Sequence, residues 1–139
     1  MTHEPRIVAF LCNWCAYRAA DLAGTIRRPY AANVRTVRCT CSGRIGPELI
    51  LRTLQAGADG VLVVGCHPGE CHRGDGNVKA LRRISLLRRL LAGAGIEPER
   101  VDIAWTAASE GARFADVADR MASQLSRLGP LPRETAPPQ

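Results

Sequence analysis

The feature that most constrains the fold is a set of short apolar runs that alternate with segments of helical pattern. Gly60–Gly65 is the clearest run, because it is rich in valine, continuously apolar and bounded by glycine, as expected of a strand buried on both faces. Residues 7–11, 34–38 and 101–105 have the same character. We therefore predict four buried strands.

Helical patterns lie between and after these runs. We predict helices over residues 16–28, 47–56, 77–92 and 109–128. Apolar residues at helical spacing should form the buried stripe of the third helix (Leu81, Ile84, Leu87 and Leu91) and of the last (Phe114, Val117, Met121 and Leu125). Ser109 is expected to cap the last helix.

The alternation of strand and helix predicts a single α/β domain over residues 1–129. Its four-stranded parallel sheet should carry helices on both faces. A flavodoxin-like strand order is compatible with this pattern. Residues 130–139 are polar and rich in proline, so we expect them to form a disordered tail.

The composition argues against several classes of protein. The formal charge is +6, but the arginines are scattered and only 4% of residues are aromatic, which argues against nucleic-acid binding. No apolar run is long enough to span a membrane. The N-terminal residues do not resemble a signal peptide, which favours the cytoplasm.

The six cysteines all follow predicted strands. Cys12 and Cys15 follow the first, Cys39 and Cys41 the second, and Cys66 and Cys71 the third. The carboxyl ends of parallel strands share one edge, where open α/β folds bind ligands. Thiolates gathered there would suit an iron–sulfur cluster, zinc or copper.

Other interpretations of these cysteines remain open at this point. The spacing of Cys12 and Cys15 also fits a dithiol oxidoreductase. Several cysteine pairs are equally typical of structural zinc, and cysteine is often simply a buried residue. His67 and His72 flank the third pair, where we expect them to form hydrogen bonds around the site or to face solvent.

Several segments together resemble one known family, the delta subunit of methyl-viologen-reducing hydrogenase. They are FLCNWCAY at 10–17, CSGRI at 41–45, GADGVLV at 57–63, GCHPGECH at 65–72, and SEG at 109–111. They occur in the family's order and cover nearly all of the chain except its termini. The Cys12–Cys15 motif alone would be weak, but the three cysteine segments together are highly specific.

The resemblance implies a 2Fe–2S cluster in a protein that relays electrons and is not an independent catalyst. The implied partners are a hydrogenase or formate dehydrogenase and a heterodisulfide-reductase-like flavoprotein. The cysteines that match the family pattern are Cys12, Cys15, Cys41, Cys66 and Cys71. They are five candidates for four ligand positions. Cys39 has no counterpart. It is either an exchangeable ligand or a buried thiol on the second strand, and we expect the latter.

The third helix is rich in arginine, with Arg82, Arg83, Arg88 and Arg89 between its apolar residues. Charged helix faces are usually just solvated. A basic face can also dock an acidic partner. The sequence leaves both interpretations open.

Overall fold

The computed structural model describes residues 5–12, 16–25, 33–39, 45–67 and 76–131. Its strands are β1 (Ile7–Cys12), β2 (Val34–Cys39), β3 (Gly60–Gly65) and β4 (Val101–Trp105). Its helices are α1 (Ala16–Thr25), α2 (Pro47–Gln55), α3 (Gly76–Gly93) and α4 (Gly111–Leu128), with a 3₁₀ turn, η2 (Pro98–Arg100), before β4. These elements confirm the predicted alternation.

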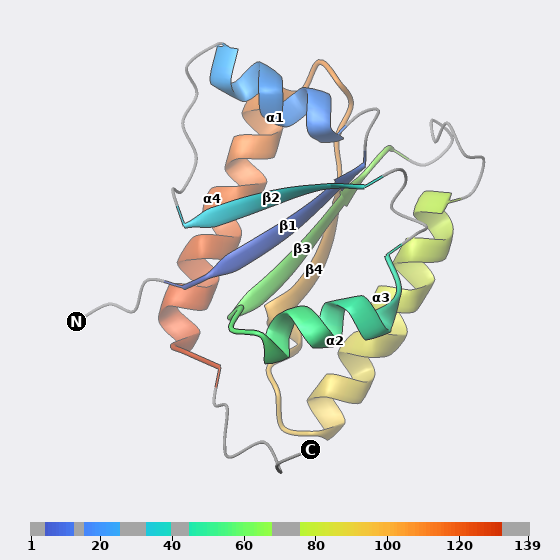
Figure 1. Ribbon diagram of the computed structural model, residues 1–139, viewed down its shortest axis with the longest axis vertical. Helices are drawn as coiled ribbons and strands as arrows, with labels where there is room; N and C mark the ends of the chain where they lie inside the picture. The colour runs from blue at the N-terminus through green and yellow to red at the C-terminus, as the bar shows by residue number, and fades with distance from the viewer. Residues whose placement is uncertain (1–4, 13–15, 26–32, 40–44, 68–75, 132–139) are drawn as a thin grey trace.

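All strand pairs are parallel, and the sheet order is β2-β1-β3-β4. This is the order of the first four strands of a flavodoxin-like sheet. Figure 1 shows α1 and α4 on one side of the sheet and α2 and α3 on the other. The predicted class, a four-stranded parallel α/β fold with helices on both faces, is confirmed.

Two apolar cores lie on opposite faces of the sheet, and β3 contributes to both. Leu62 and Val64 pack in the cluster of α1 and α4, while Val61 and Val63 pack in the cluster of α2 and α3. Successive side chains of a strand point to opposite faces, so a strand covered on both sides must be apolar throughout. A Cβ at Gly60 would overlap Leu125 Cδ1, so any side chain there would force the packing of α4 to shift.

The prediction that all four strands are buried is wrong for β2 and holds only in part for β4. Residues 35–38 are exposed, and only Val34 is buried. In β4, residues 102–105 are half-buried. The physical reason is position, since β2 and β4 lie at the two ends of the sheet and each pairs with one neighbour. A strand at an edge tolerates polar residues, and its place in the sheet is not revealed by local sequence.

Two details of the helices also differ from expectation. Leu81 is 40% exposed, and Ala80 takes its place beside Ile84, Leu87 and Leu91 in the buried stripe of α3. Val117 is only half-buried, whereas Ala118 is fully buried in the core. A small alanine gives a weak periodicity signal beside leucine and valine, and this is why the predicted stripe is one residue off at both places.

The expected end points of the helices need smaller corrections. The N-cap of α4 is Glu110, not Ser109, and α2 ends at Gln55. Gly129 terminates α4 at a positive φ of 81°, a conformation that glycine adopts readily. Residues 26–28 of the first predicted helix lie outside the described residues.

Leu131 is anchored at the end of the domain. It is buried, and its N–H donates to Asp59 Oδ1 at 3.1 Å. Asp59 Oδ2 accepts from the Arg6 N–H at 3.0 Å, so one buried carboxylate joins both ends of the domain. Residues 132–139 lie outside the described residues, and the expected disorder of the tail stays a prediction.

A fully buried arginine lies where η2 meets β4. Arg100 donates through Nε to Glu97 Oε1 at 2.9 Å and through Nη1 to the Asp59 carbonyl at 3.1 Å. Its Nη2 donates to the Gly129 carbonyl at 3.0 Å. One guanidinium thus joins η2, the start of β3 and the end of α4.

Stability should depend on the ionisation of Glu97. The hydrogen bond from Arg100 and one from its own backbone N–H hold the pKa of Glu97 below its ordinary 4.5. A lowered pKa stabilises the fold fully above the unfolded-state pKa, and this contribution is lost as pH falls through the folded-state pKa. We expect Glu97→Gln to be less stable than the unsubstituted protein near pH 7, with the difference shrinking below about pH 4. Urea unfolding across that range measures it, and a pH-independent difference would contradict the assignment.

Candidate metal centre

Two cysteines meet at the carboxyl ends of the two central strands. Cys12 is the last residue of β1, and Cys66 directly follows β3. The strand order reverses between these neighbours, because the chain moves outward from β1 to β2 and then crosses back to β3. Such a switch point is where open α/β sheets bind ligands. The predicted meeting of the first and third cysteine segments is confirmed for these two residues.

The two sulfurs are close but not bonded to each other. Cys12 Sγ and Cys66 Sγ lie 3.7 Å apart, and each residue is 2% exposed. A disulfide would bring the sulfurs to about 2.05 Å, far shorter than the distance between Cys12 Sγ and Cys66 Sγ. Two thiolates on one tetrahedral metal, with bonds of about 2.3 Å, are roughly 3.8 Å apart. The pair is therefore spaced as two ligands of a single metal ion would be.

The start of α1 supports one of these sulfurs. The N–H of Ala16, the first residue of α1, donates to Cys12 Sγ at 3.3 Å. This N–H belongs to the first turn of a helix, where backbone donors have no partner within the helix. A donor here stabilises negative charge on the sulfur, as a thiolate ligand requires.

Cys39 is directed elsewhere, although it pairs in register with Cys12 across β1 and β2. Its Sγ donates to the Leu11 carbonyl at 3.2 Å, and the side chain is half-buried rather than fully buried as expected, because β2 lies at the edge of the sheet. It packs against the α2 and α3 core, whereas Cys12 and Cys66 belong to the α1 and α4 core. The contacts of Cys39 are thus those of a thiol at the end of β2.

Asn77 holds the segment that carries Cys66. Its Nδ2 donates to the carbonyls of Cys66 at 2.9 Å and of His67 at 3.0 Å, while its Oδ1 accepts from the Val78 N–H at 2.9 Å. The residue is 1% exposed, so these bonds are shielded from water. No role for Asn77 is predicted from the sequence, although an asparagine in the first turn of a helix is a usable signal.

A polar pair, His67 and Glu110, lies beside Cys66 at the same edge of the sheet. His67 Nε2 lies 2.5 Å from Glu110 Oε1, which also accepts from the Ala107 N–H at 2.7 Å. The hydrogen bond from His67 and the one from Ala107 lower the pKa of Glu110, so it is a carboxylate at neutral pH. His67 forms a hydrogen bond beside the site, as expected, and Glu110 is a further participant that sequence reasoning missed.

Comparison with known proteins identifies the family. Residues 7–129 match the family model for the delta subunit of methyl-viologen-reducing hydrogenase. This chain belongs to that family. The resemblance seen in the cysteine segments is thereby confirmed.

Members of the family occur both as separate proteins and within longer chains. The chain is 52% identical over 128 residues to an iron–sulfur subunit of the F420-non-reducing hydrogenase of Archaeoglobus profundus, covering 92% of this chain and 93% of that protein. It is 46% identical to the vhc hydrogenase iron–sulfur subunit of Methanococcus voltae, covering 91% and 88%. It is 44% identical to a subunit of the CoB-CoM heterodisulfide reductase of Methanosarcina acetivorans, covering 94% of this chain and only 16% of that protein.

The donor set of this family member fits a cluster with thiolate ligands. Cys12 and Cys66 would supply soft thiolate ligands in a buried place, with a backbone donor at one sulfur. Cys15, Cys41 and Cys71 lie outside the described residues, as do Trp14 and His72. The described ranges contain two of the five family cysteines, Cys12 and Cys66. Within these ranges no group of three or more metal-binding side chains occurs.

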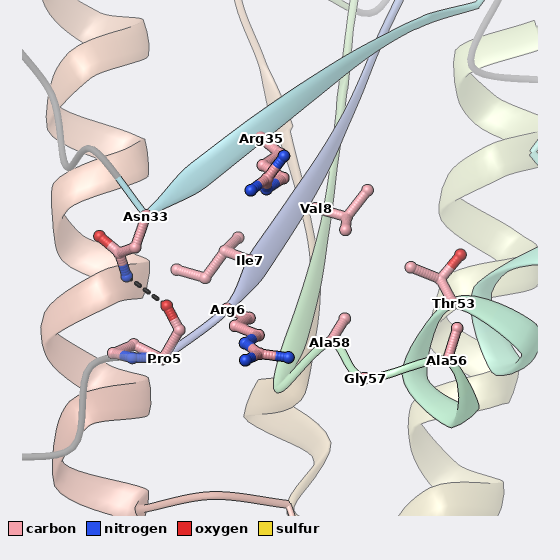
Figure 2. A pocket seen from close by; sticks show the side chains of 10 residues that line it. All are labelled: Pro5, Arg6, Ile7, Val8, Asn33, Arg35, Thr53, Ala56, Gly57 and Ala58. Atoms are coloured by element: carbon pink, nitrogen blue, oxygen red, sulfur yellow. Dashed lines mark hydrogen bonds between the residues drawn. The ribbon is translucent and has the colours of Figure 1, made fainter.

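The opposite edge of the sheet contains a separate hollow of about 820 Å³. Figure 2 shows it at the amino ends of β1 and β2, where Asn33 donates to the Pro5 carbonyl and Arg6 and Arg35 line the wall. No cysteine of the described chain lines it, and it has no part in the candidate metal centre.

None of the helices in the described segments combines the length and apolar character needed to cross a bilayer.

Proposed function

We propose that this chain is an iron–sulfur electron-transfer protein whose 2Fe–2S cluster relays electrons within a hydrogenase-linked complex. The observation that carries the proposal is the buried pair of Cys12 and Cys66 at the switch point, 3.7 Å apart. The family supports it, because relatives of this length are named hydrogenase iron–sulfur subunits.

The cluster needs four ligands, and the described pair supplies two of them. The other two come from among Cys15, Cys41 and Cys71, which match the family pattern and lie in the segments after β1, β2 and β3. Cys39 is not a ligand in this proposal, because its thiol already donates to Leu11.

The cluster, when bound, accepts and releases one electron at a time. The protein's part is to exclude water and to hold the ligands still. Burial of Cys12 and Cys66 limits the access of solvent to the cluster. The hydrogen bond from the Ala16 N–H to Cys12 Sγ favours the reduced state of the cluster and so raises its reduction potential. Asn77 keeps the Cys66 segment in one geometry against α3.

The proposed partners follow from the family. Electrons would enter from a hydrogenase or formate dehydrogenase and leave to a heterodisulfide-reductase-like flavoprotein, in the cytoplasm. One relative is a heterodisulfide reductase chain in which a domain of this kind makes up 16% of the length. A domain joined covalently to such a protein is well placed to exchange electrons with the rest of it.

The alternatives make different demands on the same thiols. A dithiol oxidoreductase needs an accessible nucleophile, and Cys12 is 2% exposed with Cys66 Sγ as its described sulfur neighbour. A structural zinc protein that assembles a complex uses the same tetrahedral thiolates. The identity of the metal therefore separates the proposal from its strongest competitor.

Anaerobic purification should give a reddish-brown protein with about two iron atoms per chain and acid-labile sulfide. Its visible absorption should bleach when dithionite supplies electrons. Iron and zinc are measured by elemental analysis, and the reduced cluster by electron paramagnetic resonance. A colourless protein with stoichiometric zinc, or a reversible Cys12–Cys15 disulfide in iron-free protein, would overturn the proposal.

A further inference from the structure

The outward side of α3 carries cations and leucines together. We call Arg82, Arg83, Leu86, Arg89 and Leu90 the arginine–leucine face. Steps of three, four or seven positions relate these residues, so they share one side of the helix. All five are exposed, and Leu86 and Leu90 are 59% and 62% exposed. Two large apolar side chains thus lie in solvent within a cluster of three positive charges.

The fold itself does not require this face. The opposite stripe of α3, formed by Ala80, Ile84, Leu87 and Leu91, is buried, and the last three pack in the core with α2 and β3. Figure 1 shows α3 at the outer side of the α2 and α3 layer, with no element of the described chain over it. Any surface that covers Leu86 and Leu90 must therefore come from another molecule or from outside the described residues.

The charged residues of α3 are all positive. The helix contains five cationic residues and no Asp or Glu. One of them, Arg88, turns towards η2 and β4: its Nε donates to the Pro98 carbonyl at 3.1 Å, and its Nη1 lies 3.9 Å from Asp102 Oδ1. A solvated helix face usually mixes both signs of charge, which stabilises the helix through pairs three or four residues apart. α3 offers no acidic side chain of its own for such pairs.

The charges also select the kind of partner. A second copy of this chain docked through the same face would bring Arg82, Arg83 and Arg89 against their own counterparts, which opposes association. A membrane surface is disfavoured too, because the face has two leucines, no aromatic residue, and a helix held to the sheet by its other side. An acidic protein surface with a small apolar centre complements both features.

We propose that the arginine–leucine face docks a carboxylate-rich surface of a partner protein, with Leu86 and Leu90 at the centre of the contact. This deepens the proposed function and rests on it, since the partner belongs to the electron-transfer complex. The same helix begins at Gly76, and its second residue, Asn77, holds the Cys66 segment. Arg82 follows Asn77 by roughly 8 Å along the helix and Leu86 by roughly 14 Å, so the near end of the docked partner lies towards the cysteine edge.

The first test reverses the charge of the face in the full chain. The triple variant R82E/R83E/R89E, carrying an affinity tag in its own host, should retain its iron and visible spectrum. It should recover at least tenfold less hydrogenase or heterodisulfide reductase than the unsubstituted chain at low salt. The matched control is R18E/R120E/R127E, which reverses three exposed arginines on α1 and α4. This control should retain its partners.

The second test locates the contact. A photo-crosslinking amino acid at position 86 should join this chain to a peptide of the partner that contains several Asp or Glu residues. Changing those acidic residues to lysine should restore assembly with R82E/R83E/R89E, as expected of direct charge pairing. A crosslinked acidic peptide and this rescue would together support the proposal.

Other outcomes overturn it. One is that R82E/R83E/R89E recovers as much partner protein as the unsubstituted chain, or that the control variant loses as much as R82E/R83E/R89E does. Another is that the crosslinker at position 86 joins the chain to a second copy of itself. A third is that the chain binds vesicles containing phosphatidylglycerol through this face and binds no partner protein. Failure of the proposed function looks different, because the unsubstituted chain would then contain no iron. If only the docking proposal fails, the protein still contains iron and dithionite still reduces it.

Discussion

Replacing Cys66 with serine should remove most of the bound iron, lowering the iron content of anaerobically purified protein by about tenfold or more. The reason is local, since Cys66 Sγ lies 3.7 Å from Cys12 Sγ in a place that water does not reach. A serine hydroxyl is a harder and weaker ligand for iron than a thiolate. The visible absorption that dithionite bleaches should fall in parallel.

Cys12→Ser should behave in the same way, because Cys12 shares the site. The matched control is Cys39→Ser, which changes the same atom in the strand that neighbours β1. A serine at position 39 can still donate to the Leu11 carbonyl, so this variant should keep its iron and its fold. Circular dichroism checks that each variant is folded. Full iron in Cys66→Ser, or loss of iron in Cys39→Ser, would show that the assignment of ligands is wrong.

Replacing Arg100 with leucine should destabilise the fold by about 3 kcal/mol, a large loss for one side chain. The guanidinium is fully buried and donates to Glu97 and to the carbonyls of Asp59 and Gly129. Leucine leaves those two carbonyls without this donor, and each buried acceptor that is left unsatisfied is costly. Urea denaturation followed by circular dichroism measures the loss.

Arg127→Leu is the control for that prediction, because Arg127 is an exposed arginine in the last turn of α4. It should change the free energy of unfolding by less than about 0.5 kcal/mol. Equal losses in the two variants would mean that the burial of Arg100 contributes nothing specific. The iron content of Arg100→Leu, measured where it is still folded, should be unchanged, since Arg100 lies at the edge of the sheet opposite the cysteines.

The order of strands and helices could be predicted because each element carries its own pattern. Gly60–Gly65 is apolar throughout and bounded by glycine, and its predicted bounds match β3. The predicted bounds of β4 also match, and each of β1 and β2 is one residue longer than predicted. Local patterns are weaker guides where burial depends on neighbours, as in the exposed strand β2 and at Leu81.

The sequence alone determined the family, the parallel α/β class and the position of Cys12, Cys39 and Cys66 at the carboxyl ends of strands, because these depend on residue type and on order along the chain. Only the tertiary structure decided which thiols meet. It brought Cys12 and Cys66 together across 54 residues of chain, and it turned Cys39 to the other core. It also buried Arg100 and linked His67 with Glu110. These contacts join residues that are far apart in the chain. Cys12 and Cys66 lie side by side because the chain returns through α2 from β2 at the edge to β3 beside β1, and no local sequence pattern encodes this crossing.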